Sequence, residues 1–234
     1  MSWDHVKGNV EEVRRRISAA SQRAGRRAEE VTLIAVSKTH PAEAIRAAYD
    51  AGVRHFGENR VQEWEGKRAG AADLGAAWHL IGHLQSNKAA RAAKLFDCVD
   101  SVDDFALAQR LDRGREESGA TEKLRALIEV RVAQEETKSG VEISEVAALA
   151  EKIAVLPRLV LAGLMCIPPY LENIEEVRPY FQKLRTLRDE MQTKLGLSLP
   201  VLSMGMSHDF EAAIEEGSTE VRVGTAIFGA RELK

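Results

Sequence analysis

The feature that most constrains the fold is a repeated switch in hydrophobic spacing along the chain. The run Thr32-Leu-Ile-Ala-Val-Ser37 is typical of a short buried strand, whereas the apolar residues of segment 4–25 recur three or four positions apart, as on one helix face. The switch repeats to the end of the sequence. Strands that alternate with helices in this way favour a parallel sheet.

Eight segments are expected as strands: 32–37, 54–57, 78–82, 97–101, 125–132, 160–166, 200–204 and 220–223. Helices are expected at 4–25, 41–52, 59–68, 85–95, 104–118, 143–156, 174–195 and 209–216. Eight such units in 234 residues predict an α/β fold, a single (β/α)8 TIM-type barrel with residues 1–234 as one domain. An open, doubly wound sheet is the competing architecture. Little chain follows the last strand, so an extra N-terminal helix is expected to cover the gap left by a missing final helix.

Composition narrows the class of protein. The net charge of −3 and the lack of a basic block argue against a nucleic-acid partner. Apolar runs such as 159–165 are too short to span a bilayer, and the N-terminus lacks the apolar centre of a secretory signal. Cys98 and Cys166 lie in apolar runs, as reduced buried thiols do. We therefore expect a cytoplasmic protein without a membrane partner, and no His/Cys/Asp pattern predicts a metal site.

Lys38 directly follows the first buried strand, at the end of the barrel where active sites gather. Burial lowers the pKa of a lysine and exposes the neutral amine, which is the form that attacks an aldehyde. A solvated lysine at a strand end is the plainer interpretation.

Two segments near the C-terminus have the pattern of a phosphate site. Ser207 precedes an expected helix, and Gly224-Thr225 follows the eighth strand. In barrels of this type the loops after strands seven and eight frequently bind phosphate. A helix N-cap and an ordinary turn would leave the same pattern.

Arg222 alternates with two valines in the last strand, so it is expected to point into the barrel. A buried arginine needs an acceptor, either a ligand or a structural ion pair with Glu58 or Glu129.

Seven segments resemble the pyridoxal 5′-phosphate (PLP) homeostasis protein family, also called the YggS/PROSC type. They are LIAVSKTHPAEAI, HFGENRVQE, WHLIGHLQSNK, EETKSG, GLMCIPP, LSMGMSHDFEAAI and VRVGTAIFG, in family order from about residue 31 to 230. The resemblance implies the barrel of alanine-racemase-like, type III PLP proteins without their second, β-rich domain.

The resemblance also implies roles for individual residues. The PLP-binding set is Lys38 as the Schiff-base lysine, Asn59, His83, Ser207, Arg222, Gly224 and Thr225, and Lys138 is a candidate for cofactor exchange. In this set Ser207, Gly224 and Thr225 would bind the phosphate, and Arg222 would face the pyridine nitrogen. An arginine stays protonated and so donates to an unprotonated ring nitrogen, which weakens the cofactor as an electron sink.

Racemases of similar fold also use a tyrosine base from the second domain. Of the three tyrosines here, Tyr170 alone is expected near the active end. The expected function is therefore a non-catalytic PLP carrier. It would act in the homeostasis of PLP and of linked amino and keto acid pools, as a monomer that can pass PLP to recipient apoenzymes. A slow amino-acid racemase or decarboxylase is the alternative, and a barrel enzyme for a phosphorylated sugar is a third hypothesis.

Overall fold

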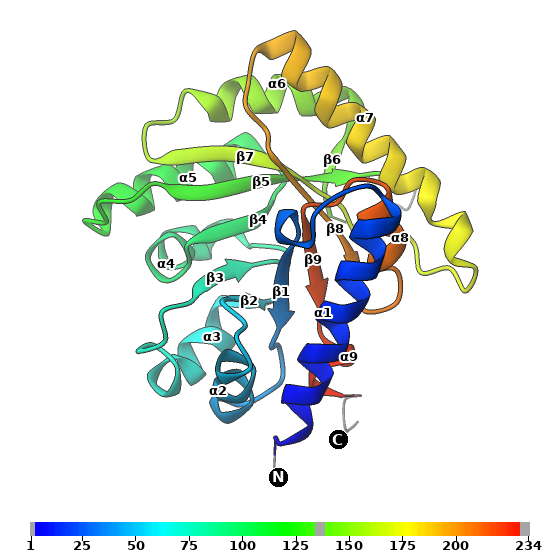
Figure 1. Ribbon diagram of the computed structural model, residues 1–234. Coiled ribbons are helices and arrows are strands. Elements are labelled where there is room, and N and C mark those ends of the chain that lie inside the picture. Colours follow the sequence, from blue (N-terminus) through cyan, green and yellow to red (C-terminus); the bar gives the residue numbers. More distant parts are fainter. Residues whose placement is uncertain (1–2, 134–138, 230–234) are drawn as a thin grey trace.

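The computed structural model describes residues 3–133 and 139–229. The barrel strands are β1 (Thr32–Val36), β2 (His55–Glu58), β3 (Ala77–Leu80), β4 (Cys98–Val102), β5 (Leu124–Arg131), β7 (Leu159–Met165), β8 (Val201–Met206) and β9 (Glu220–Val223). In the described part of the chain these eight strands pair in the order β4-β3-β2-β1-β9-β8-β7-β5, and β4 also pairs with β5. All these pairs are parallel, so the sheet closes into the expected TIM-type barrel (Figure 1).

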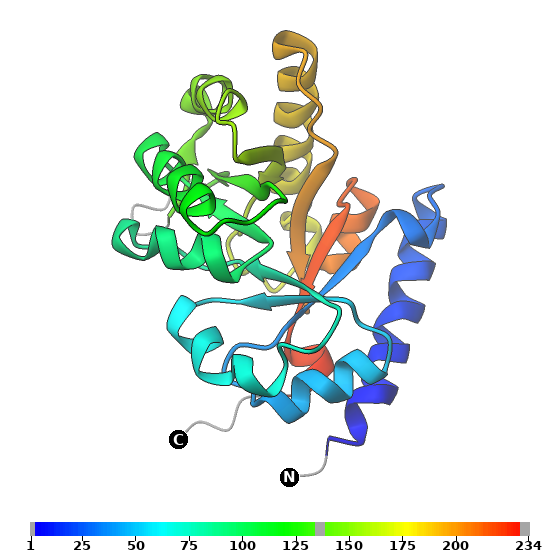
Figure 2. The same ribbon diagram turned by 90° about the vertical axis from the view of Figure 1, so that its left-hand side faces the viewer.

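Helices form the layer outside the strands (Figures 1 and 2). They are α1 (His5–Arg23), α2 (Ala42–Asp50), α3 (Val61–Lys67), α4 (Ala89–Leu95), α5 (Phe105–Glu117), α6 (Ile143–Ala154), α7 (Arg178–Leu195), α8 (Phe210–Glu215) and α9 (Thr225–Phe228). Short 3-10 turns are η1 (Ala28–Glu30), η2 (Arg68–Gly70), η3 (Ser86–Lys88) and η4 (Ile174–Glu176). The predicted strands agree with these bounds to within two residues.

Differences from the expected elements concentrate at helix ends. The helix expected from residue 174 begins at Arg178, because Pro179 belongs to its first turn and Ile174 lies in a separate 3-10 turn. Residues 86–88 likewise form a 3-10 turn ahead of α4. Two short elements were not expected: α9, and the strand β6 (Val141–Glu142), which pairs with the end of β5. Both are shorter than the windows in which periodicity can be recognised.

Side chains alternate between the helices and the barrel interior. On the outward face of β2 and β3, Phe56 stacks on Trp78 and Trp64 of α3 stacks on the same indole, with ring centroids 5.3 and 3.6 Å apart. These aromatic rings are buried and form part of the apolar layer between the sheet and the helices. On the inward face, positions such as Glu129 and Arg222 are polar, which leaves room for chemistry inside the barrel.

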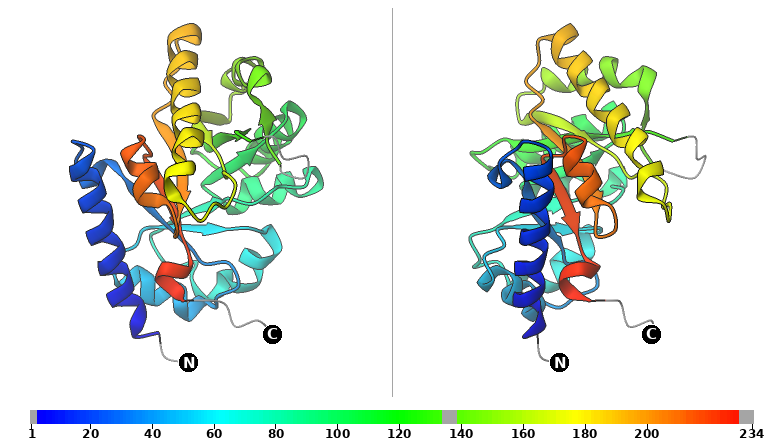
Figure 3. Two further views of the ribbon diagram at one scale, coloured as in Figure 1. Left: turned by 90° about the vertical axis from the view of Figure 1, so that its right-hand side faces the viewer. Right: turned by 45° about the vertical axis from the view of Figure 1, so that its right-hand side comes forward.

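The N-terminal helix α1 covers the seam between the ends of the chain, as expected. It lies beside α8, α9 and α2, and its buried face consists of Val6, Val10, Val13, Ile17 and Ala20 (Figure 3). The side-chain amide of Asn9 also donates to the carbonyl of Ile227, 2.8 Å away. Among the described residues, no helix is long and apolar enough to cross a membrane.

Candidate functional site

A cavity of about 530 Å³ opens at the carboxyl ends of the strands. Seven of the residues proposed from the sequence line it: Lys38, Asn59, His83, Ser207, Arg222, Gly224 and Thr225. The volume lies in the range of small-molecule sites. Lys138, the candidate for cofactor exchange, lies outside the described residues. The strand ends and the loops after them therefore bring five distant parts of the sequence to one cavity.

Lys38 is held by an unusual turn directly after β1. The next residue, Thr39, has a φ of 67°, which β-branched residues rarely adopt. Its backbone N–H donates to a carboxylate oxygen of Glu63 in α3, and this bond offsets the cost of the turn. The half-buried Lys38 side chain lines the cavity, and its backbone is held in place by the neighbouring turn.

A second lysine clamps the same turn from outside the barrel. Lys67 Nζ donates to the carbonyls of Ser37 (2.7 Å) and His40 (3.2 Å), and lies 2.7 Å from Glu58 Oε1. Ser37 Oγ donates to the same Glu58 oxygen at 2.5 Å. Burial raises the pKa of Glu58, and Lys67 opposes that rise. The hypothesis that Glu58 pairs with Arg222 is therefore wrong: Glu58 points outward and supports the Lys38 turn. This clamp was not predictable from the sequence, because Lys67 is 29 residues from Lys38.

The turn after β8 depends on a glycine and an aspartate. Gly205 has a φ of +93°, and a Cβ there would lie 2.6 Å from that of Ala213. The buried Asp209 accepts the N–H of Met206 through Oδ1 at 2.7 Å. Together they orient Ser207, whose Oγ accepts the N–H groups of Gly224 (3.1 Å) and Ala226 (3.4 Å). The Ser207 hydroxyl proton is then directed away from both N–H groups and can be donated to an anion in the cavity.

Arg222 points into the barrel, as expected, and is 3% exposed. Its guanidinium donates to Ser203 Oγ at 2.7 Å and to the carbonyl of Cys166 at 2.8 Å. Within the described chain it forms no ion pair, so its positive charge meets neutral acceptors. The Cys166 thiol beneath it is fully buried, and burial raises the pKa of this thiol to about 12, which keeps it protonated.

Glu129 is the unpaired carboxylate of the cavity. It is 6% exposed, and its Oε2 has no hydrogen-bond partner among the described residues. Burial, reinforced by Asp103, raises the pKa of Glu129 to about 7, although Arg222 opposes the rise. Glu129 was expected as an ion-pair partner of Arg222, but no direct contact joins the two in the described structure.

The opposite wall is more exposed. His83 lies 3.3 Å from an Asp103 carboxylate oxygen, measured from Nδ1, and its side chain is 54% exposed. Tyr170 also lines the cavity and packs against His208, with ring centroids 4.9 Å apart. Its placement near the active end is therefore confirmed.

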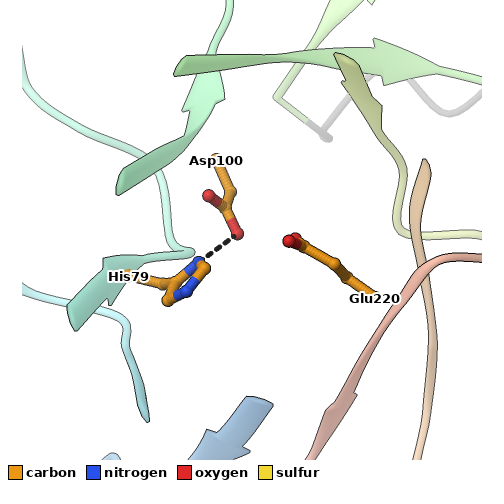
Figure 4. A group of neighbouring side chains, drawn as sticks. All are labelled: His79, Asp100 and Glu220. Carbon is orange, nitrogen blue, oxygen red and sulfur yellow. Dashed lines mark hydrogen bonds and ion pairs between the residues drawn. The ribbon is translucent and has the colours of Figure 1, made fainter. Parts of the chain in front are cut away.

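Deeper in the barrel lies a second polar group, here called the lower cluster: His79, Asp100, Arg125 and Glu220. His79 Nδ1 is 3.3 Å from Asp100 Oδ2, and the Glu220 carboxylate points toward both from β9 (Figure 4). Arg125 donates to Glu220 Oε1. His79, Asp100 and Glu220 come close enough to hold a metal ion. The sequence did not indicate this arrangement, because the three residues lie on three different strands.

The charges of the lower cluster already balance. Burial alone would lower the pKa of His79, but Asp100 and Cys98 outweigh it and hold this pKa well above the usual value. His79 is then a cation, which donates from Nε2 to His55 Nδ1 at 3.1 Å. Burial and His79 lower the pKa of His55 to about 4, so His55 is neutral and can accept. With two cations facing two carboxylates, we interpret the cluster as an ion network.

Comparison with known proteins gives a consistent result. The family model for the alanine racemase N-terminal domain matches residues 8–232. The pyridoxal phosphate homeostasis protein of Aquifex aeolicus is 48% identical over 217 residues, which cover 93% of this chain and 94% of the relative. The protein of the same name from Escherichia coli K12 is 45% identical over 234 residues and covers 96% of each chain.

A solved structure extends the likeness to three dimensions. PipY of Synechococcus elongatus, determined with PLP bound, superposes with a TM-score of 0.80. It is 44% identical, and the match covers 86% of this chain and 93% of that one.

Proposed function

The chain belongs to the alanine racemase N-terminal domain family and, within it, to the pyridoxal phosphate homeostasis proteins, and from that premise we propose that it holds PLP as a Schiff base on Lys38. We further propose that it stores and releases this cofactor without turning over a substrate. In that role it would influence PLP supply and the amino and keto acid pools linked to it, with apoenzymes as recipients.

One observation carries the proposal: a single cavity is lined by a lysine amine, a serine hydroxyl and a buried arginine. PLP supplies an aldehyde, which condenses with a neutral amine to form a C=N bond with loss of water. Lys38 is the amine that the strained turn presents to the cavity. The neighbouring Lys67 amine is occupied by two carbonyls and a carboxylate, so it is a poor competitor.

The Ser207 region fits the phosphate end. Ser207 Oγ already accepts two backbone N–H groups, and its own proton remains for a phosphate oxygen. Thr225 adds an exposed hydroxyl beside it. Gly224 has a φ of −113°, and a Cβ there would make ordinary contact with Val36, so neither strain nor crowding requires a glycine. We propose that its role is to leave the backbone open to the approaching phosphate.

Arg222 supports a carrier over an enzyme. Its guanidinium is fixed by the Ser203 hydroxyl and the Cys166 carbonyl, and a guanidinium has donors but no acceptor. As the partner of the pyridine nitrogen it would donate a hydrogen bond and keep its proton. The ring would then withdraw electrons weakly, and loss of a substrate proton would be slow.

The position of Tyr170 favours a second candidate function, the slow racemisation of a small amino acid. It is a 75% exposed phenol on the cavity wall, and a proton acceptor across from the cofactor is what racemisation requires. Chiral analysis of alanine and serine after long incubation tests this activity. Turnover that exceeds free PLP and falls in Tyr170→Phe would establish it, and turnover equal to free PLP would reject it.

The visible spectrum tests the main proposal. We expect protein mixed with PLP and freed of excess ligand to be yellow, and Lys38→Ala to lose that band. Lys38→Arg keeps the charge without an amine that can condense, and should be colourless as well. Lys123→Arg, at an exposed position just before β5, is the matched control and should stay yellow. A band that persists in both Lys38 variants would contradict the assignment.

A further inference from the structure

A second cavity, of about 380 Å³, adjoins the first at the ends of β2 and β3. It is lined by Asn59, Arg60, Val61, Gln62, Leu80, His83, Leu84, Gln85 and Lys88. Asn59 and His83 line both cavities, so their side chains stand on the wall between them. Most of this lining comes from the segments GENRVQ and HLQSNK, and the proposed function uses just Asn59 and His83 from them.

The fold brings these two segments together tightly. A Cβ on Gly82 would lie 2.5 Å from the backbone oxygen of Asn59, so the loop after β3 presses directly on the end of β2. The 3-10 turn Ser86–Lys88 then returns Lys88 toward the same place, where it faces the pocket with Arg60. The pocket is thus built by backbone contact between two adjacent strand ends.

The charge of this pocket is uncompensated. Arg60 and Lys88 line it, and none of the described residues that line it is acidic. In the described chain neither side chain has a hydrogen bond or an ion pair. Their neighbours behave differently: Arg91 contacts Glu65, and Lys67 contacts Glu58. Two free cations at the rim of one pocket repel each other unless an anion lies between them.

We propose that this second cavity is an anion subsite for a small molecule that carries a carboxylate or a phosphate group. The Arg60 guanidinium offers a planar fork that matches either group, and Lys88 adds a compact point charge. Gln62 and Gln85 provide neutral donors at the same pocket. The proposal goes beyond the cofactor function, since no residue that it requires is used to hold PLP.

Calorimetric titration with inorganic phosphate and, separately, with succinate tests the subsite in PLP-treated protein. We expect saturable binding of at least one anion, weakened about tenfold or more in Arg60→Ala/Lys88→Ala, because each charged hydrogen bond contributes about one factor of ten. Added salt should weaken binding further. The stronger of the two anions identifies the ligand class.

Two variants control the comparison. Lys123→Ala removes an exposed cation just before β5, at the other end of the barrel, and should bind like the wild type. Lys88→Arg keeps the charge and should retain binding within about threefold. Melting temperatures of all variants show that each is folded.

Equal affinity in the wild type and the double variant would overturn the subsite, as would the lack of saturable binding up to about 10 mM. The visible spectrum, recorded before the titration, shows whether PLP has bound. A protein that does not bind PLP counts against the cofactor proposal and leaves the subsite to be tested by the variants. The variant comparison decides the subsite with or without PLP, because Arg60 and Lys88 lie outside the cofactor cavity's lining.

Discussion

The two ends of the barrel interior handle buried charge in opposite ways. In the lower cluster, Arg125 meets Glu220 and His79 meets Asp100, so each charge has an opposite partner. Two residues further along β9, Arg222 donates to neutral oxygens, while Glu129 Oε2 has no hydrogen-bond partner among the described residues. One end is therefore closed by its own ion pairs, and the other keeps its charges for what enters the cavity.

This difference explains how one small barrel can be stable and still keep a site for the proposed charged cofactor. Burying an ion is costly unless a partner is near. The lower cluster supplies these partners within the chain. The cavity lined by Lys38, Glu129 and Arg222, here called the upper site, leaves them to be supplied by a ligand. Binding there should stabilise the protein, because a ligand that binds the folded state alone shifts the folding equilibrium.

The largest expected effect comes from breaking the lower cluster. Arg125→Leu leaves the Glu220 carboxylate buried without its cation and should lower the free energy of unfolding by about 3 kcal/mol. Urea denaturation measures the change. Arg125→Leu/Glu220→Leu removes both charges and should recover most of the loss. If the single and double variants are equally destabilised, the lower cluster is not held by charge pairing.

The second largest expected effect concerns Glu129 in the upper site, whose charge has no opposite partner in direct contact among the described residues. The pKa of Glu129 in the folded chain is about 7, above the ordinary value of 4.5, so the folded state binds the proton more tightly than the unfolded state. The stabilisation that protonation of Glu129 gives the folded state is complete below pH 4.5 and is lost as the pH rises through about 7.

Glu129→Gln removes that dependence. Without PLP, this variant should be about 2 kcal/mol more stable than the wild type at pH 8 and equally stable at pH 4.5. Denaturation curves at the two pH values provide the measurement, with Glu151→Gln on the exposed face of α6 as a control. A gain of the same size at both pH values would mean that ionisation of Glu129 is not its cause.

The strands were predictable and the partners of their side chains were not. Strands such as β1 and β7 are apolar runs, because helices cover the outer face and strands flank them, and such runs are visible in a single sequence. Loop order then brought Lys38, Ser207 and Gly224 together correctly. Whether Glu58 faces inward depends on the exact pleat of β2, where the inward residue is Gly57, packed near Ile34 and Ile81.

The lower cluster was missed for a related reason. Its members come from β3, β4, β5 and β9, and they meet at one depth because of the register between neighbouring strands. Register is set by the closed barrel as a whole and leaves no local pattern. One member was predictable as an inward residue. Glu220 precedes Arg222 by two positions, so the two side chains lie on the same face of the strand.

The smallest predicted effect concerns the Ser207 hydroxyl. Ser207→Ala loses one donor to the phosphate but leaves the N–H groups of Gly224 and Ala226, so PLP should bind about tenfold more weakly while the yellow colour survives. Equilibrium dialysis gives the dissociation constant, and Ser118→Ala at the end of α5 serves as the control. Unchanged affinity would remove Ser207 from the phosphate site.

The most direct measurement is mass spectrometry of the PLP-treated protein after borohydride reduction and proteolysis, because reduction fixes the cofactor where it is attached. We predict a single pyridoxyl group on Lys38, with Lys67 unmodified in the same sample. A label on Lys67 or spread over surface lysines, or the absence of any label, would contradict the claim that the upper site is built to hold PLP on Lys38.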